Sequence, residues 1–323
     1  MCTAIRIKNG DCYFGRTLDV ERSYGERVMI TPRDFPFGFA KEEGKPDRYA
    51  MIGMGAEAEG YPLYFEAANE KGLAMAGLSF CESARYFPKK EGARNVAPFE
   101  FIPWVLSRCG SLDEAKGELE ALNLCDVNFS DSLPSSPLHW IIADRNGALT
   151  VESADTGLRV YENSIGVLTN EPPFDYHMTH LRGYMGLSKN QPENKFPLEN
   201  AVPYSRGMGA MGLPGDFSST SRFVRAAFVK QNSVCGESED ERVEQFFHIL
   251  GSVVQPKGCV RLDDGSLEFT AYSSCINLDK GIYYYTTYND SRIKAVDING
   301  CRLEGGSVFT FELESKWGIN RRN

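Results

Sequence analysis

Residues 1–19 read MCTAIRIKNGDCYFGRTLD, and this opening of the 323-residue chain decides the fold. The Asn-Gly pair at 9–10 separates two runs of strand-forming residues, an arrangement typical of a tight β-hairpin. The sequence therefore predicts strands over 3–8 and 12–16, with the first strand beginning at the chain terminus. Most chains instead begin with a few disordered residues, so we expect Cys2 to be held in place.

Removal of Met1 would bring a thiol and an amine together on Cys2. A small side chain at position 2 favours that removal during synthesis. The ordinary pKa values, about 8.5 for a thiol and about 7.7–8.0 for an α-amine, allow the amine to accept the thiol's proton near neutral pH. Cys2 can then act as both nucleophile and base, positioned by its strand. A chain that keeps Met1 has an amide at residue 2 and should be inactive.

The returning strand carries GRTLD, residues 15–19, and brings Arg16 and Asp19 close to the terminus. An arginine near a cysteine favours the thiolate, and a carboxylate can hold the terminal ammonium. The same residues also fit a plainer interpretation. In that interpretation Cys2 is a small buried residue beside an ordinary ion pair at a strand end.

Strand patterns occur throughout the chain, and helical patterns are grouped in two blocks. This order favours an α+β sandwich over alternating βαβ units. No linker interrupts the sequence, so we expect residues 1–323 to form a single domain. Beyond the hairpin, the expected strands are 28–31, 50–54, 73–80, 140–144, 149–153, 159–161, 166–169, 270–277, 281–287 and 293–297, and the expected helices are 99–109, 112–122, 176–186, 220–231 and 240–253.

Composition narrows the possible classes of function. The net charge of −9 argues against non-specific binding of nucleic acid. No apolar run approaches the roughly 18 residues of a membrane span, and no signal-peptide pattern is present, so we expect a cytoplasmic protein without membrane contact. The nine cysteines are irregularly spaced without a CxxC pair, which indicates reduced thiols rather than a disulfide framework or a metal site.

Nine segments, spread in order over nearly the whole chain, resemble the choloylglycine hydrolase family of bile-salt hydrolases and penicillin V acylases. They are MCT (1–3), FGRTLD (14–19), YAMIGMG (49–55), NEKGLAMAGLSF (69–80), LHW (138–140), GVLTNEPPFDYH (166–177), GLPGDFSSTSRFVRAAF (212–228), FFHIL (246–250) and KGIYYYTTY (280–288). The resemblance implies a four-layer αββα sandwich of the N-terminal nucleophile hydrolase type. It also implies an amidohydrolase without metal or cofactor, and a homo-oligomer, because tetramers are common in the family.

The resemblance assigns roles to five residues. It makes Cys2 the nucleophile, with Arg16 steadying the thiolate and Asp19 contacting the α-amino group. Asn170, in the LTNEP turn, contributes to holding the tetrahedral intermediate, and Arg222 is the second arginine of the site. Oxyanion stabilisation needs such fixed donors where charge develops. Taken singly, Asn170 also fits a turn, and Arg222 fits the solvated face of an amphipathic helix.

Ser79, in GLSF, departs from the family pattern. Bile-salt hydrolases usually carry asparagine at this position, and penicillin V acylases often carry tyrosine. The shorter serine hydroxyl reaches less far toward an oxyanion, although the backbone N–H of Ser79 can still serve as a donor. This position therefore does not separate the two substrate classes.

The resemblance also places a substrate groove and a head-group site. A rigid apolar steroid needs a broad apolar groove with few polar groups, and the family alignment lines it with Leu18, Phe65, Phe129, Leu133 and Leu138. All of these except Leu18 are expected in or beside loops, where they could instead simply cap the core.

The stretch Ser205-Arg206-Gly207 matches the loop that often carries a Ser-Arg pair in taurine-preferring members of the family. An arginine offers forked donors to a sulfonate, so we expect taurine conjugates to be preferred. The alternative is an arginine solvated on a flexible loop.

We therefore expect a bile-salt hydrolase in which Cys2 attacks the amide and water then hydrolyses the thioester. A penicillin V acylase, or an acylase acting on other N-acyl compounds such as acyl-homoserine lactones, would use the same atoms. Two hypotheses outside this class are a non-catalytic binding protein for amphipathic acids and a redox-sensing thiol at Cys2.

Overall fold

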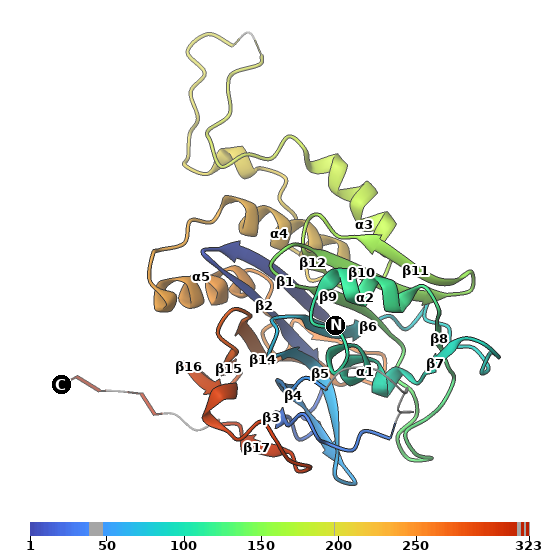
Figure 1. The fold of residues 1–323 in the computed structure, drawn as a ribbon. Helices are drawn as coiled ribbons and strands as arrows, with labels where there is room; N and C mark the ends of the chain where they lie inside the picture. The colour runs from blue at the N-terminus through green and yellow to red at the C-terminus, as the bar shows by residue number, and fades with distance from the viewer. Residues whose placement is uncertain (39–47, 197, 315–317, 320, 323) are drawn as a thin grey trace.

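A computed structural model describes residues 1–38, 48–196, 198–314, 318–319 and 321–322, and two antiparallel sheets dominate it (Figure 1). The first sheet has the order β12-β1-β2-β14-β15-β16, with β13 paired to β14. Its strands are β1 (Cys2–Asn9), β2 (Asp11–Val20), β12 (Val167–Leu168), β13 (Val260–Arg261), β14 (Leu267–Asn277), β15 (Ile282–Thr287) and β16 (Asp290–Asp297).

The second sheet has the order β11-β10-β9-β6-β5-β4-β3-β17. Its strands are β3 (Arg27–Thr31), β4 (Met51–Ala58), β5 (Tyr61–Asn69), β6 (Ala74–Ser79), β9 (Leu138–Ala143), β10 (Ala148–Ala154), β11 (Gly157–Glu162) and β17 (Phe309–Glu312). A short parallel pair, β7 (Arg94–Val96) and β8 (Leu122–Leu124), lies apart from both sheets.

Helices cover the outer face of each sheet, which completes four layers and confirms the predicted αββα sandwich. Helices α4 (Ser219–Asn232) and α5 (Glu239–Gly251) pack on β1, β2, β12 and β14, and α3 (Phe174–Leu181) packs on α4. Helices α1 (Phe101–Leu106) and α2 (Leu112–Leu119) share a buried cluster with the second sheet. The 3₁₀ turns are η1 (Pro98–Glu100), η2 (Arg182–Tyr184), η3 (Met208–Ala210) and η4 (Ile298–Gly300).

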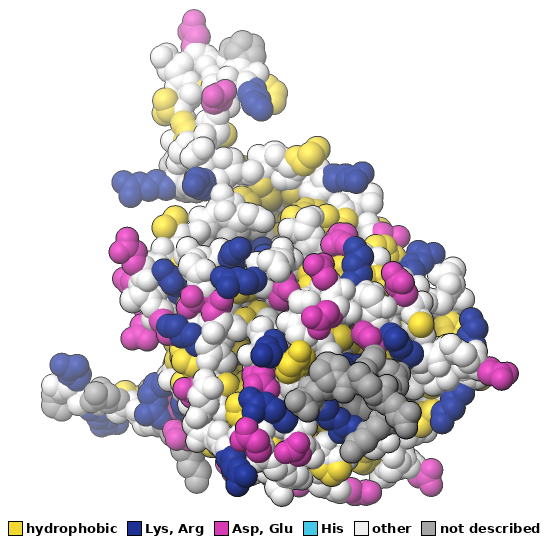
Figure 2. All heavy atoms as spheres, viewed as in Figure 1, with side chains coloured by type: hydrophobic (Ala, Val, Ile, Leu, Met, Phe, Trp, Pro, Cys, Tyr) yellow, Lys and Arg dark blue, Asp and Glu magenta, His cyan; other side chains and the backbone are white. Residues whose placement is uncertain are grey.

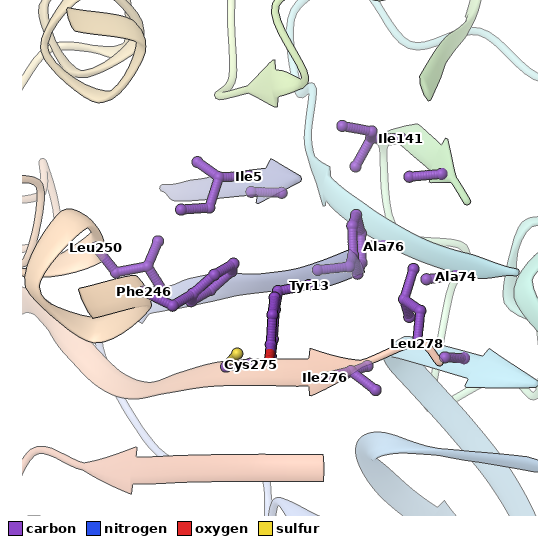
Figure 3. Packing of buried hydrophobic residues seen from close by; sticks show 14 of the residues in the cluster. Ile5, Tyr13, Ala74, Ala76, Ile141, Phe246, Leu250, Cys275, Ile276 and Leu278 are labelled. Atoms are coloured by element: carbon purple, nitrogen blue, oxygen red, sulfur yellow. The ribbon is translucent and has the colours of Figure 1, made fainter. Parts of the chain in front are cut away.

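The main core joins the two sheets to α5 (Figure 3). Ile5 and Tyr13 of the hairpin lie between Phe246 and Leu250 of the helix and the residues Ala74, Ala76 and Ile141 of the second sheet. All of these side chains are buried. The core therefore holds the N-terminal hairpin from both sides and fixes the start of β1.

The structure confirms the predicted hairpin and extends it. Cys2 pairs with Leu18, and the register continues without interruption to Asn9 and Asp11. The turn residue Gly10 has a φ of +69°, which glycine adopts without strain. The strand expected to begin at residue 3 therefore begins at Cys2 itself.

Some predicted elements were wrong in extent or were missed. The helix expected over 99–109 is a 3₁₀ turn followed by α1, and the helix expected over 112–122 ends at Leu119 before β8. Strand β5 was missed because Pro62 and acidic Glu66 weaken its strand pattern. Its neighbours β4 and β6 hold it in the sheet through antiparallel pairing.

Among the residues that the structure describes, no helix has the length and hydrophobicity that a membrane span requires.

Replacing Gly15 tests how closely β2 approaches β14. A Cβ at this position would lie 2.0 Å from the carbonyl oxygen of Ser274, which is backbone and cannot move aside alone. We expect Gly15→Ala to destabilise the fold by about 1–3 kcal/mol through overpacking. Gly117→Ala on α2, where a Cβ meets nothing within 4 Å, is the matched control and should raise stability slightly. Equal melting temperatures for the two variants would contradict this reading of the sheet.

Candidate active site

The chain terminus is fixed by two hydrogen bonds before the first strand begins. The Met1 ammonium donates to the backbone oxygen of Asp19 (2.8 Å) and to Oε2 of Glu268 (2.8 Å). Cys2 follows as a buried residue, and its backbone N–H donates to Oδ1 of Asn170 (2.8 Å). The structure thus shows the chain with Met1 attached, in which the nitrogen of Cys2 is an amide.

Arg222 is buried beside Cys2 and joins three parts of the site. Its Nη1 donates to the backbone oxygen of Cys2 (2.6 Å) and to Oγ1 of Thr3 (2.7 Å), and its Nη2 donates to Oδ1 of Asn170 (2.7 Å). Burial lowers the pKa of Arg222, and electrostatic interactions with Asp19, Cys2 and Glu268 oppose that effect. The alternative of a solvated arginine on α4 is therefore wrong.

Asn170 is held at every polar atom. Its Nδ2 donates to the carbonyl of Ser79 (2.9 Å), and its backbone N–H donates to Oγ of Ser219 (2.8 Å). Nε2 of His177 lies 2.8 Å from its backbone oxygen. Burial lowers the pKa of His177 to about 4, so the ring is neutral near pH 7 and donates Nε2–H to that carbonyl. Asn170 is thus fixed by its surroundings on several elements.

Arg16 lies fully buried between the two sheets. Its Nη1 donates to the carbonyls of Gly77 (2.6 Å) and Phe65 (3.3 Å), and it lies 3.8 Å from Oε2 of Glu66. Burial lowers the pKa of Arg16, but electrostatic interactions with Cys2, Tyr272, Glu66 and Asp19 outweigh burial and raise it overall. The guanidinium is therefore a permanent positive charge that interacts electrostatically with Cys2.

Asp19 is buried and accepts hydrogen bonds from three side chains. Thr270 donates to Oδ1 (2.6 Å), while Thr17 (3.3 Å) and Gln255 (3.4 Å) donate to Oδ2. The ammonium near it belongs to Met1 and binds Glu268, so the expected contact between Asp19 and the α-amino group of Cys2 stays a prediction. Thr270, Gln255 and Glu268 lie some 250 residues from the hairpin, and sequence reasoning missed them.

Ser79 ends β6 beside Asn170. Its hydroxyl lies 3.1 Å from Sγ of Cys81, while its carbonyl accepts the Asn170 amide. The loop after it is bound by Glu171, whose carboxylate accepts the backbone N–H of Glu82 (3.1 Å) and of Ser83 (2.9 Å). The chain segments on both sides of Asn170 and Ser79 are therefore tied together.

The expected groove residues fall into two groups. Leu18 lies opposite Cys2, and Leu138 lies opposite Ser79 in the sheet register. Phe65, whose carbonyl accepts Arg16, lies inside β5, so the expectation of a loop position for it was wrong.

Phe129 and Leu133 are the second group, in the loop between β8 and β9. The Phe129 ring packs with Tyr61 and Phe99, at centroid distances of 5.7 and 5.3 Å, and Leu133 is exposed. Their contacts do not connect them to Cys2.

Ser205 and Arg206 lie in the long segment between α3 and α4, which projects from the body of the molecule (Figure 1). Both side chains are exposed, the carbonyl of Ser205 accepts Nε2 of Gln191 (2.9 Å), and its hydroxyl donates to the carbonyl of Arg206 (3.1 Å). Within this chain the structure does not join them to the residues around Cys2.

The arrangement offers a thiol, two buried guanidinium groups, a fixed carboxamide and a carboxylate at the start of one strand. These groups suit attack by sulfur on a carbonyl and stabilisation of the charge that develops. No group of three or more metal-ligating side chains occurs in the part of the chain that the structure describes.

Known proteins match this chain along nearly its whole length, including all of the residues described above. The family model "Linear amide C-N hydrolases, choloylglycine hydrolase family" matches residues 2–311. A bile salt hydrolase/transferase of Lactiplantibacillus plantarum is 49% identical over 317 residues, covering 98% of each chain. A bile salt hydrolase/transferase of Clostridium perfringens is 37% identical over 329 residues, covering 100% of each chain.

Solved structures agree with the sequence relatives. A mutant of the conjugated bile acid hydrolase from Clostridium perfringens has a TM-score of 0.90 at 36% identity, covering 100% of both chains. The penicillin V acylase from Agrobacterium tumefaciens has a TM-score of 0.75 at 20% identity, covering 98% of this chain and 92% of that one, and shares the fold. The chain described here therefore belongs to the choloylglycine hydrolase family and is a linear amide C–N hydrolase.

Proposed function

We propose that this protein hydrolyses the amide bond of conjugated bile salts, with Cys2 as the nucleophile once Met1 has been removed. The observation that carries the proposal is the placement of Cys2, whose backbone N–H binds Asn170 and whose carbonyl binds Arg222. Identity of 49% to a bile salt hydrolase/transferase along 98% of the chain supports the substrate class.

In the proposed reaction, the free α-amine of Cys2 accepts the proton of its own thiol. Sγ attacks the amide carbonyl, and the carboxamide of Asn170 and the backbone N–H of Ser79 are the proposed donors to the developing oxyanion. The tetrahedral intermediate then collapses, the C–N bond breaks, and the ammonium of Cys2 gives its proton to the leaving amine. Water then attacks the thioester while the amine takes its proton. The C–S bond breaks, which releases the bile acid, and the ammonium returns its proton to Sγ and restores the thiol.

Other readings of the same site lead to different products. A penicillin V acylase would release phenoxyacetate, and a non-catalytic binding protein would hold an amphipathic acid without turnover. A redox-sensing thiol would be oxidised reversibly without hydrolysis. The identity along the whole chain to hydrolases named for bile salts favours deconjugation among these four.

The nucleophile is tested by intact mass and hydrolysis on one sample. We expect the purified protein to lack one methionine and to release taurine from taurocholate faster than it cleaves penicillin V. Cys2→Ser should lower kcat/KM by roughly 10³-fold or more, because it removes the reacting sulfur. Cys259→Ser, at an exposed cysteine, should leave the rate unchanged. A mature terminus that hydrolyses neither amide would contradict the enzyme reading.

We also propose that Arg206 favours taurine conjugates. Its exposed guanidinium offers forked donors to the three oxygens of a sulfonate, whereas a glycine conjugate ends in a carboxylate. Within this chain, the contacts of the projecting segment do not reach the residues around Cys2. For Arg206 to contact substrate, the segment must therefore approach an active site.

Arg206→Ala should lower kcat/KM for taurocholate by roughly three- to tenfold and for glycocholate by less, since one charge-assisted contact is lost. Arg182→Ala, in η2 beside the same segment, is the control at an arginine without this role. Equal losses for both conjugates would show that Arg206 does not select the head group.

We further propose that the chain is one domain and that it assembles as a homotetramer through the projecting segment. The main core draws on residues from Cys2 to Ile298, which supports a single domain. Along the segment, apolar side chains stand in solvent (Figure 2). They are Met185, Phe196, Leu198, Val202, Tyr204 and Met211, each more than 60% exposed. Such a set of exposed apolar residues marks a contact with another protein surface.

Replacing Phe196 and Leu198 with serine should shift the molar mass measured by light scattering from tetramer toward monomer, because the apolar contact is lost. Val234→Ser, at an 82% exposed valine between α4 and α5, should leave the tetramer intact. A monomeric parent protein would contradict the assembly.

A further inference from the structure

Glu66 is a buried carboxylate at the interface between the two sheets. It projects from β5 of the second sheet and is 0% exposed. Two tyrosines of the first sheet reach it. Tyr272 of β14 donates to Oε2 (2.7 Å), and Tyr283 of β15 donates to Oε1 (2.5 Å). Each carboxylate oxygen thus has its own hydroxyl donor from the facing sheet.

Burial and the opposing charges of neighbouring groups shift the pKa values in this cluster. Burial raises the pKa of Tyr272 and of Tyr283 well above the ordinary value, so both hydroxyls keep their protons and donate them. Burial also raises the pKa of Glu66, while Arg16, Tyr283, Tyr272 and Ser274 act in the opposite direction. The carboxylate therefore depends on these neighbours for its charge.

Glu66 is also the charged neighbour of Arg16. The distance from Oε2 to Nη1 is 3.8 Å, and both side chains are at most 1% exposed. The carbonyls of Gly77 and Phe65 orient the same guanidinium as neutral acceptors. Ser274 is near both groups, because its hydroxyl accepts the backbone N–H of Arg16 (3.2 Å) and its interaction with Glu66 lowers the pKa of that carboxyl.

We propose that Glu66, held by Tyr272 and Tyr283, is a positioning residue that fixes Arg16 beside the Cys2 thiol. This inference rests on the proposed function of Cys2 as the nucleophile. Glu66 touches neither Cys2 nor substrate, and it acts through the guanidinium alone. A buried ion pair fixes the position of its partner, and removing one member leaves the other charge without compensation. The competing account is that Glu66 simply ties the two sheets together.

The charged and titratable groups facing Glu66 come from three strands. Arg16 approaches from β2, Tyr272 from β14 and Tyr283 from β15. Each can be altered separately, which makes a test by coupled substitutions possible.

The test compares Glu66→Gln with the parent and with a matched control. Glutamine keeps the volume and one acceptor oxygen for a tyrosine hydroxyl, but its NH2 group cannot accept from the second tyrosine. It also removes the charge, so Arg16 loses its ionic partner. We expect kcat for taurocholate, per folded molecule, to fall by roughly tenfold while KM changes by less than about threefold, since contact coupling is of this size. Glu66→Asp, which keeps the charge, should recover part of the loss. Asp290→Asn is the control at another buried carboxylate, paired with Lys294 on β16, and should keep the parent kcat.

A second readout needs no substrate and separates this inference from the proposed function. The rate of Cys2 alkylation by iodoacetamide is followed on the N-terminal peptide by mass spectrometry. Glu66→Gln should change this rate in the parent but have no further effect in an Arg16→Leu background, because it acts through Arg16. An equal effect in both backgrounds, or an unchanged rate and kcat in the parent, would overturn the inference. Hydrolysis that persists in Cys2→Ser would instead contradict Cys2 as the nucleophile. The alkylation measurement would still test whether Glu66 acts on Cys2 through Arg16.

If Glu66→Gln fails to fold, Tyr283→Phe replaces it. This variant removes one hydroxyl donor and keeps the carboxylate. It should lower kcat by roughly threefold and alter Cys2 alkylation only when Arg16 is present. Loss of stability at unchanged kcat and unchanged alkylation would show a purely structural role and overturn the inference.

Discussion

Burial of two arginine side chains next to the first residue of β1 is the constraint on which the rest of this structure depends. A buried guanidinium is tolerated only where acceptors surround it. Arg222 donates to the carbonyl of Cys2 and to the side chain of Asn170. Arg16 donates to three backbone carbonyls and lies beside the carboxylate of Glu66. Elements distant in sequence must therefore converge on the chain terminus.

The convergence explains why the terminus is ordered. The hairpin is clamped in the main core between α5 and the second sheet, and the polar network forms at the open end of the same strands. His177 and Ser219 hold the backbone of Asn170, while Thr270 and Gln255 hold Asp19. Each of these groups is itself buried. Packing of these buried groups thus fixes the positions of Asn170 and Asp19 beside the start of β1.

The sequence alone predicted the local part of this arrangement well. The Asn-Gly turn determined the hairpin, and the hairpin register placed Arg16 and Asp19 near Cys2. The site roles of Asn170 and Arg222 were predicted from the family resemblance. Their local sequence patterns do not distinguish them from a turn residue and a surface helix residue. Partners such as Glu268 carry no local signal, since their role arises from pairing between β2 and β14. The position of Phe65 was wrong for a similar reason: neighbouring strands, rather than its own pattern, hold β5 in the sheet.

The ion pair between Met1 and Glu268 has a consequence for maturation. The proposed removal of Met1 would move the terminal positive charge one residue along β1, from the nitrogen that binds Glu268 to the nitrogen that binds Asn170. Glu268, whose Oε1 has no hydrogen-bond partner, would lose the ammonium bound to its Oε2 and keep its electrostatic interaction with Arg222. Excision of one residue would therefore redistribute charge inside the protein, so the electrostatic surroundings of the terminus would differ between the precursor and the mature chain.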